Sequence, residues 1–250
     1  MTSTKRLLLL GHRGARVPHL PENTIAAFDL ALQAGCDGFE FDVRRTRDRQ
    51  LVVVHDPRLG GLEVAGSTYA ELQQRWQERI VPRLPLTQRR SLAHEQLALL
   101  CLPDVLQRYR GRAFLDIELK APGMEDAVLQ ALADHAPERF LVSSFLPEVL
   151  LAVAERDQQV PLGLIAENAR QLTKWSHLPL SFVIPQLKLA TGELIEDAHG
   201  AGKQVMVWTA NREEDVKRLA NWGADAIVSD DPEMLARVAT SPPGGREEFH

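Results

Sequence analysis

Residues 38–56 read Gly-Phe-Glu-Phe-Asp-Val, then a charged turn, then Leu-Val-Val-Val-His-Asp. Side chains alternate between the two faces of an extended strand, so Glu40 and Asp42 share one face and the apolar residues take the other. Two carboxylates on so apolar a strand are costly to bury unless a cation lies between them, most simply a divalent one. A solvent-facing antiparallel strand is the alternative. The aliphatic run Leu51–Val54 argues against it, because it places His55 at the end of a second apolar segment.

The composition is that of a globular protein with one large core: 250 residues, 44% of them hydrophobic and 25% charged. A net charge of −5 provides no basic field for nucleic acid, so we expect no nucleic-acid partner, and local cations would have to meet any anionic substrate. Two unpaired cysteines, Cys36 and Cys101, favour a reducing compartment. The apolar run Leu7–Leu10 is too short for a signal peptide or a membrane span. We therefore expect no stable membrane insertion and a cytoplasmic location.

Apolar runs alternate with helical patterns along the whole chain. Strands are expected at Leu7–Leu10, Gly38–Val43, Phe114–Leu119, Phe140–Val142, Leu162–Ile165, Phe182–Ile184, Gln204–Trp208 and Ala226–Val228. Helices are expected at Thr24–Ala34, Pro103–Tyr109, Glu125–His135, Pro147–Arg156, Ala169–Trp175, Gly192–Ala201, Glu213–Asn221 and Pro232–Val238. Eight such units predict an α/β fold, a closed (β/α)8 TIM barrel. An open doubly wound sheet is the competitor, but no Gly-x-Gly-x-x-Gly turn follows the first strand.

The domain layout follows from one break in this rhythm. We expect a single TIM-barrel catalytic domain over residues 1–239, with a small insertion after the second strand at residues 57–100. A capping box at Thr68–Glu71 predicts a short helix in that insertion. The Pro/Gly-rich segment 240–250 is expected to be a flexible C-terminal tail.

Polar residues gather where the strands end. In a parallel barrel these ends meet on one face, where the chemistry of such folds is located. The polar residues at the expected strand ends are His12, Arg13, Glu40, Asp42, His55, Asp56, Glu118, Lys120, Ser143, Ser144, Glu167, Gln186, Lys188, Trp208, Asn211, Ser229 and Asp230. Alternation along the third strand also points Asp116 the same way as Glu118, with Lys120 beyond them near the rim.

Three of these residues, Glu40, Asp42 and Glu118, form a carboxylate set that favours a hard divalent cation, Mg²⁺ or Ca²⁺, over zinc. A cation so placed beside histidines and basic residues suits metal-assisted attack at a phosphorus ester. Arg13 and Lys120 are candidates to hold the phosphate oxygens.

The histidines His12 and His55 are candidates for acid and base, because an imidazole titrates near neutral pH. Trp208 is a candidate platform for an alcohol moiety, although it could simply fill the barrel. The pair Ser143-Ser144 lacks the Gly-x-Ser-x-Gly elbow of a nucleophile and is expected to be a polar wall or helix cap.

The chain combines several short motifs, namely His12-Arg13-Gly14, Pro21-Glu22-Asn23-Thr24, Glu40-x-Asp42-Val43, Thr46, Asp48, Val53-Val54-His55-Asp56, Glu118-Leu119-Lys120, Ser143-Ser144-Phe145, Val207-Trp208-Thr209-x-Asn211 and Ser229-Asp230-x-Pro232. In this combination, over roughly residues 7–238, the chain resembles the glycerophosphodiester phosphodiesterase family of the bacterial, cytoplasmic type.

The resemblance implies hydrolysis of glycerophosphodiesters to sn-glycerol 3-phosphate and an alcohol, through a cyclic phosphate formed by the glycerol 2-hydroxyl. It also implies a role for each candidate. One divalent cation would be bound by Glu40, Asp42 and Glu118, the acid-base pair would be His12 and His55, and phosphate would be held by Arg13 and Lys120. Glu22 would help to order the first loop.

The chain departs from the family pattern in two places. Arg49 stands where a glycine usually follows the aspartate, and Pro57–Gly61 replaces the common segment after His55-Asp56. Because that segment should cover the pocket, the sequence does not predict which alcohol headgroup is preferred. It also leaves open the choice between Mg²⁺ and Ca²⁺, which histidine is acid and which is base, and whether the protein forms a homodimer.

Three other functions are alternatives. A lysophospholipase D-like phosphodiesterase would need an apolar channel. A catalytically silent binding homologue would have lost charged positions that this chain retains. A zinc amidohydrolase barrel would need His-x-His after the first strand, where this chain has His12-Arg13-Gly14.

Overall fold

The computed structural model describes residues 6–18, 20–79 and 94–240, and it confirms the closed barrel. Its parallel strands are β1 (Leu8–His12), β2 (Gly38–Arg45), β6 (Phe114–Leu119), β7 (Phe140–Ser144), β8 (Leu162–Ala166), β9 (Phe182–Pro185), β10 (Gln204–Val207) and β11 (Ala226–Ser229). Each strand pairs with its neighbour in this order, and β1 pairs with both β2 and β11. The ring is therefore closed without a free edge. Residues 241–250 of the expected tail (240–250) and residues 80–93 of the insertion lie outside the described residues.

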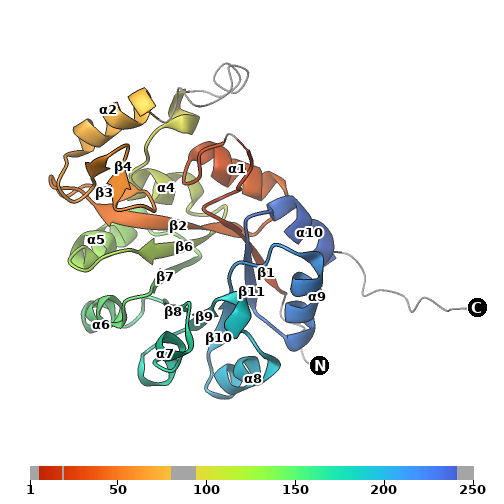
Figure 1. Cartoon of the computed structure of the whole chain (residues 1–250). Helices are drawn as coiled ribbons and strands as arrows, with labels where there is room; N and C mark the ends of the chain where they lie inside the picture. The colour runs from red at the N-terminus through yellow and green to blue at the C-terminus, as the bar shows by residue number, and fades with distance from the viewer. Residues whose placement is uncertain (1–5, 19, 80–93, 241–250) are drawn as a thin grey trace, which may run out of the picture.

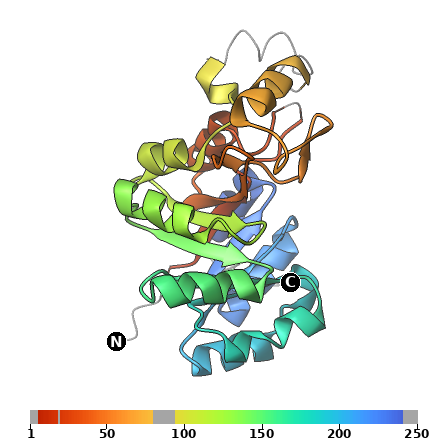
Figure 2. The ribbon, with the colours of Figure 1, turned by 90° about the vertical axis from the view of Figure 1, so that its left-hand side faces the viewer.

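Helices surround the ring of strands (Figures 1 and 2). They are α1 (Ile25–Gln33), α4 (Leu102–Tyr109), α5 (Glu125–His135), α6 (Pro147–Arg156), α7 (Ala169–Leu172), α8 (Gly192–Gly200), α9 (Glu213–Trp222) and α10 (Pro232–Thr240). Start and stop signals act as expected at α1, where Thr24 Oγ1 accepts from Ala27 N–H at 3.3 Å, and after α9, where Gly223 adopts φ +84°. Among the described residues, no helix is long and apolar enough to cross a membrane.

The fifth unit differs from the prediction of one helix over Ala169–Trp175. The structure has α7 of four residues, followed by the 3₁₀ turn η3 (Trp175–His177). Thr173 Oγ1 donates to the carbonyl of Arg170 at 3.0 Å, a local bond that competes with continuation of the helix. Hydrophobic periodicity in the sequence does not predict this hydrogen bond, so it does not predict the shorter helix.

The segment after β2 forms a small substructure on the barrel. Strand β3 (Leu51–Val53) runs antiparallel to the end of β2, and the hairpin β4 (Arg58–Leu59) and β5 (Leu62–Glu63) follows it. The predicted capping box starts α2 (Tyr69–Arg79), and the 3₁₀ turn η2 (His94–Leu97) leads back to the barrel. A separate core holds these pieces together, comprising Val52, Val54, Leu59, Val64, Leu72, Trp76 and Leu99. Its packing fixes β3 and hence the chain that leads to His55.

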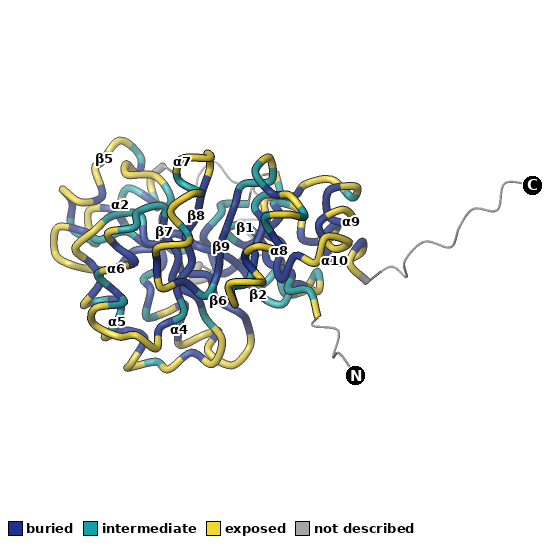
Figure 3. The backbone as a smooth tube through the Cα atoms, turned by 90° about the horizontal axis from the view of Figure 1, so that it is seen from below, coloured by how far each residue is buried: buried dark blue, intermediate teal, exposed yellow. Residues whose placement is uncertain are grey.

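The outward face of β2 explains why its carboxylates point inward. Phe39 and Phe41 pack outside the barrel against Phe28 of α1, with Phe28 and Phe39 stacked at a centroid distance of 4.0 Å. Tyr109 of α4 meets Phe39 edge-on at 4.9 Å. Aromatic side chains bury large apolar areas, so this cluster holds the strand in a single register. Figure 3 shows the buried strands at the centre of the molecule and exposed positions on the outer helices and loops.

Candidate functional site

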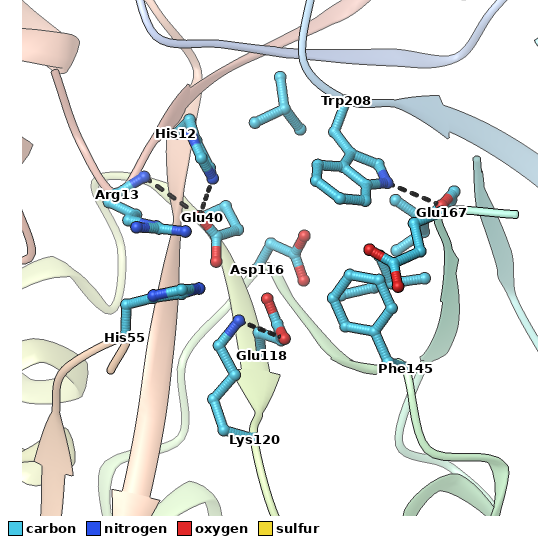
Figure 4. Close-up of a pocket in the computed structure, with 13 residues that line it drawn as sticks. His12, Arg13, Glu40, His55, Asp116, Glu118, Lys120, Phe145, Glu167 and Trp208 are labelled. Carbon is cyan, nitrogen blue, oxygen red and sulfur yellow. Dashed lines mark hydrogen bonds and ion pairs between the residues drawn. The ribbon is translucent and has the colours of Figure 1, made fainter. Parts of the chain in front are cut away.

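A pocket of about 220 Å³ opens at the C-terminal ends of the barrel strands. Its lining consists of His12, Arg13, Glu40, His55, Asp116, Glu118, Lys120, Phe145, Ile165, Glu167, Ile184, Trp208 and Val228. Figure 4 shows two halves: histidines and cations on one side, Trp208, Phe145 and Glu167 on the other, with carboxylates between them. The charged half comes from β1, β2 and β6 and from the segments that follow them.

Three carboxylates meet beneath the charged half. Glu40, Asp42 and Glu118 each offer one oxygen atom, and these atoms lie within 4.8 Å of one another. Parallel pairing of β2 with β6 aligns Asp42 with Glu118, and strand alternation puts Glu40 on the same face. All three side chains are buried. The two strands therefore bring together the three carboxylates that were predicted from the sequence as metal ligands.

The chemistry of this cluster fits a divalent cation. A cation that takes oxygen ligands at about 2.4 Å can join two oxygens no more than about 4.8 Å apart, and the cluster lies within that span. Glu40 Oε1 is buried and accepts no hydrogen bond from the described residues. A buried carboxylate oxygen without a donor is costly, and a hard cation would satisfy it. The acidic cluster can thus bind one metal ion.

The carboxylates perturb one another in the metal-free protein. Burial, followed by the charges of Asp42 and Glu118, raises the pKa of Glu40 well above its usual value. Burial also raises the pKa of Glu118, although Lys120 opposes that rise. For Asp42, burial is outweighed by Lys120 and Arg13, so the pKa of this carboxyl is lowered. The site is arranged to hold negative charge at Asp42 even without a metal.

Two cations are placed against this charge. Lys120 Nζ lies 2.8 Å from Asp42 Oδ1 and 2.6 Å from Glu118 Oε1. Arg13 Nε lies 3.2 Å from Asp42 Oδ2. Both side chains also line the pocket, so each can face an anionic group there.

The first loop is tied to the carboxylate cluster through its backbone and side chains. Arg13, at φ +53°, donates its backbone N–H to Glu40 Oε2 at 3.1 Å, and its NH1 lies 2.7 Å from Glu22 Oε1. Asn23 Nδ2 donates to Asp42 Oδ2 at 2.8 Å. The sequence analysis named Asn23 within a family motif without a site role, and no local pattern indicates this longer-range bond. Glu22 lies outside the lining of the pocket and contacts it through Arg13.

The two histidines enter the pocket from different directions and have different support. His12 ends β1, and its Nδ1 lies 2.6 Å from Asp230 Oδ1 while its Nε2 lies 3.9 Å from Glu40 Oε2. His55 follows β3, with its Nδ1 2.8 Å from the exposed Asp56. Burial lowers the pKa of His55, which favours its neutral form.

The other half of the pocket is largely apolar. Trp208 and Phe145 meet edge to face at a centroid distance of 5.6 Å, and the Trp208 indole N–H donates to the carbonyl of Ile184 at 3.2 Å. Glu167 lies at the rim beside them. At the floor, buried Asp116 accepts from Ser143 Oγ at 2.6 Å, and burial raises its pKa to about 7.

The serine pair serves the structure rather than the pocket lining. Ser144 Oγ accepts from Leu146 N–H at 3.1 Å before α6, and Ser143 holds Asp116. From the sequence, Asn211 and Asp230 were expected at strand ends and Asp116 on the same face as Glu118, but none of the three was assigned a role in the site. Strand alternation was the available signal for Asp116, whereas the contact between Asp230 and His12 depends on closure of the barrel.

Together, the fold and the site define a TIM barrel with an acidic cluster that can hold a metal ion and with cations suited to phosphate esters. Residues 12–234 match the model of the glycerophosphoryl diester phosphodiesterase family, so the chain belongs to this family.

Named relatives agree over nearly the whole chain. A glycerophosphodiester phosphodiesterase of Caldanaerobacter subterraneus subsp. tengcongensis is 29% identical, with 93% of this chain and 98% of the relative aligned. One from Bacillus subtilis is 26% identical, with 95% and 88% aligned.

Solved structures agree as well. An Oleispira antarctica phosphodiesterase in complex with the product sn-glycerol-3-phosphate is 25% identical, with a TM-score of 0.76 and coverage of 94% of this chain and 97% of that one. The glycerophosphodiester phosphodiesterase of Agrobacterium tumefaciens is also 25% identical, with a TM-score of 0.74 and coverage of 94% and 100%. The protein is an enzyme, a glycerophosphodiester phosphodiesterase.

Proposed function

We propose that the enzyme is a metal-dependent hydrolase that releases sn-glycerol 3-phosphate and an alcohol from glycerophosphodiesters. The observation that carries this proposal is the presence in one place of a carboxylate cluster within 4.8 Å, two histidines and two cations. Glu40, Asp42 and Glu118 would hold one Mg²⁺ or Ca²⁺ ion. When bound, that cation would withdraw charge from the phosphate and its oxygens.

Arg13 and Lys120 would hold the non-bridging phosphate oxygens. Arg13 is kept in place by Glu22 at 2.7 Å, and Lys120 by its ion pair with Glu118 at 2.6 Å. A guanidinium can present two parallel N–H groups, whereas an ammonium acts as a point charge. Trp208 would supply an apolar wall for an alcohol moiety.

The histidines would move the protons. In the first step one histidine takes the proton of the glycerol 2-hydroxyl, whose oxygen bonds to phosphorus as the bond to the departing alcohol breaks. The other histidine gives that alcohol its proton. In the second step a water oxygen bonds to phosphorus as the bond between phosphorus and the 2-oxygen breaks. The histidine that protonated the alcohol takes a proton from the water, and the other histidine gives its proton to the 2-oxygen, which yields sn-glycerol 3-phosphate. His12 and His55 both line the pocket, as these two reaction steps require.

The direct test is product analysis over a substrate panel. Glycerophosphocholine, glycerophosphoethanolamine and glycerophosphoglycerol would each be incubated with the enzyme, with and without chelator, and sn-glycerol 3-phosphate measured. We expect release from at least one of them, abolished by chelator and restored by Mg²⁺ or Ca²⁺. Release that is indifferent to chelator would refute the metal dependence.

Adding lysophosphatidylcholine to this panel separates the alternatives. Lysophosphatidylcholine would yield lysophosphatidic acid from a lysophospholipase D-like enzyme, and a silent homologue would bind substrate without turnover. Among the described residues, the exposed large apolar side chains are Leu151 and Trp222, and neither lines the pocket. This distribution favours a small polar substrate. A net charge of −5 likewise supports a small molecule rather than nucleic acid. The cytoplasmic location and the homodimer stay predictions.

A further inference from the structure

Asp230 and Asn211 form a hydrogen-bonded support for His12, on the edge of its ring opposite the carboxylate cluster. Asp230 follows β11, which pairs with β1, the strand that ends at His12. Asp230 Oδ1 lies 2.6 Å from His12 Nδ1, and Asp230 Oδ2 accepts from Asn211 Nδ2 at 2.7 Å. Closure of the barrel therefore brings residues from opposite ends of the chain to one ring.

The orientation of the Asn211 amide is fixed by two donors. The backbone N–H of Asp230 donates to Asn211 Oδ1 at 2.9 Å, and Ser229 Oγ donates to the same oxygen at 3.1 Å. A backbone N–H cannot accept a hydrogen bond, so the amide NH₂ of Asn211 must face Asp230. Asp230 Oδ2 is therefore an acceptor.

The remaining oxygen of Asp230 determines which nitrogen of His12 carries the proton. A carboxylate only accepts hydrogen bonds, and Arg16 NH1 at 3.7 Å from Oδ2 favours the ionised form. His12 Nδ1 must then carry a hydrogen. In the neutral ring the lone pair is left on Nε2, which points toward the cluster, 3.9 Å from Glu40 Oε2.

We propose that Asp230, held by Asn211, is a positioning residue that keeps His12 in the Nδ1–H tautomer and so makes Nε2 the nitrogen that exchanges protons with the substrate. This inference rests on the acid-base role proposed above for His12. Nε2 must both take and give a proton during one full turnover, which requires that Nδ1 keep its own hydrogen.

The structure predicts what an amide at position 230 would do. In Asp230→Asn, one side-chain position becomes an NH₂ group. That group cannot face the fixed NH₂ of Asn211, because two donors would meet, so it faces His12. Nδ1 then accepts a hydrogen bond and Nε2 carries the hydrogen. The variant should therefore hold the opposite tautomer, whose Nε2 can donate but cannot accept.

Exchanging the two side chains should reverse this effect. In the double variant Asp230→Asn with Asn211→Asp, the carboxylate at position 211 accepts from the backbone N–H, from Ser229 and from the new amide. The amide oxygen at position 230 then faces His12 and accepts from Nδ1–H. The wild-type tautomer returns although the carboxylate has moved away from the ring.

The experiment measures kcat and KM for glycerophosphocholine together with the ¹⁵N–¹H correlation spectrum of the His12 ring, which distinguishes the two tautomers. Asp231→Asn is the matched control, because Asp231 Oδ1 accepts from Met234 N–H at 2.9 Å at the start of α10 and asparagine can do the same. His12→Ala provides the reference for loss of the ring. Thermal unfolding of each variant checks that the barrel is intact.

We expect Asp230→Asn to lower kcat by about tenfold or more, with KM within about twofold, as when the carboxylate that orients a catalytic histidine is lost. Its spectrum should show the Nε2–H tautomer, and the double variant should recover activity several-fold. The inference is overturned if Asp230→Asn keeps wild-type kcat while His12→Ala is inactive, or if the wild-type ring carries Nε2–H. It is equally overturned if the double variant restores the tautomer but no activity. An active His12→Ala variant would instead refute the proposed role of His12.

Discussion

Asp116 allows a quantitative test of how the barrel floor is built. This side chain is only 1% exposed and accepts a hydrogen bond from Ser143 Oγ at 2.6 Å. Burial, reinforced by the charges of Glu118 and Asp42, raises its pKa to about 7. The change Asp116→Asn removes the titration and keeps an oxygen for the Ser143 hydroxyl.

The sign of the effect follows from proton binding. In the metal-free protein the folded state keeps the Asp116 proton up to about pH 7, whereas an unfolded aspartate loses it near pH 4. The contribution of Asp116 to the free energy of unfolding therefore falls as the pH rises from about 4 to about 7. A pKa difference of about three corresponds to about 4 kcal/mol at most. Asparagine suffers no such loss.

The assay is urea unfolding in the presence of chelator at intervals from pH 4 to pH 8. We expect similar stability of the variant and the wild type at pH 4, and a variant more stable by up to about 4 kcal/mol at pH 8. The difference between variant and wild type cancels the contributions of titrating groups that do not interact with Asp116. Asp197→Asn, on the exposed face of α8, is the control and should show no pH-dependent difference. A variant that follows the wild-type pH curve, or is less stable at pH 8, would refute the reasoning.

Three further outcomes follow from the site and the fold. Arg13→Lys keeps the charge but loses the two-pronged contact, so kcat/KM should fall by about tenfold or more; an unchanged value would make Arg13 a loop-ordering residue. His12→Ala and His55→Ala should both be nearly inactive on glycerophosphocholine, but only the variant lacking the general acid should recover on a nitrophenyl ester, which needs little protonation; equal recovery would contradict the paired roles. Gly38→Ala would place a Cβ atom 1.9 Å from the carbonyl oxygen of Phe114, so thermal unfolding should reveal a loss of about 3 kcal/mol or more, and an unchanged melting temperature would show that β2 and β6 can separate.

Much of the fold could be predicted because its signals are local. The alternation in Gly38–Val43 set the inward face of β2, and the repeated strand and helix patterns gave the order of the barrel. The exception at α7 shows the limit. The Thr173 hydroxyl bonds to the carbonyl of Arg170 where the helix ends, and hydrophobic periodicity carries no information about such a bond.

The site divides in the same way. The carboxylates, cations and histidines could be predicted because each lies in a strand or soon after one, and the C-terminal ends of the barrel strands meet on one face. The hydrogen bonds that hold His12 and Asp42 could not be predicted. Asp230 is 218 residues from His12, and Asn23 contacts Asp42 from a loop in which the φ angle of Asn23 is +59°. Such contacts depend on barrel closure and loop conformation, which one sequence does not encode as a local pattern.

The central claim is that the carboxylate cluster holds a cation that turnover requires. The most direct measurement starts from enzyme that a chelator has freed of metal. The rate of sn-glycerol 3-phosphate release from glycerophosphocholine is followed as the free Mg²⁺ or Ca²⁺ concentration is raised. The wild type is compared with Glu40→Ala, Asp42→Ala and Glu118→Ala. We predict a saturable rise from zero for the wild type and little or no activity for the folded variants at any of these concentrations. Turnover without added cation, or retained by all three variants, would contradict the account.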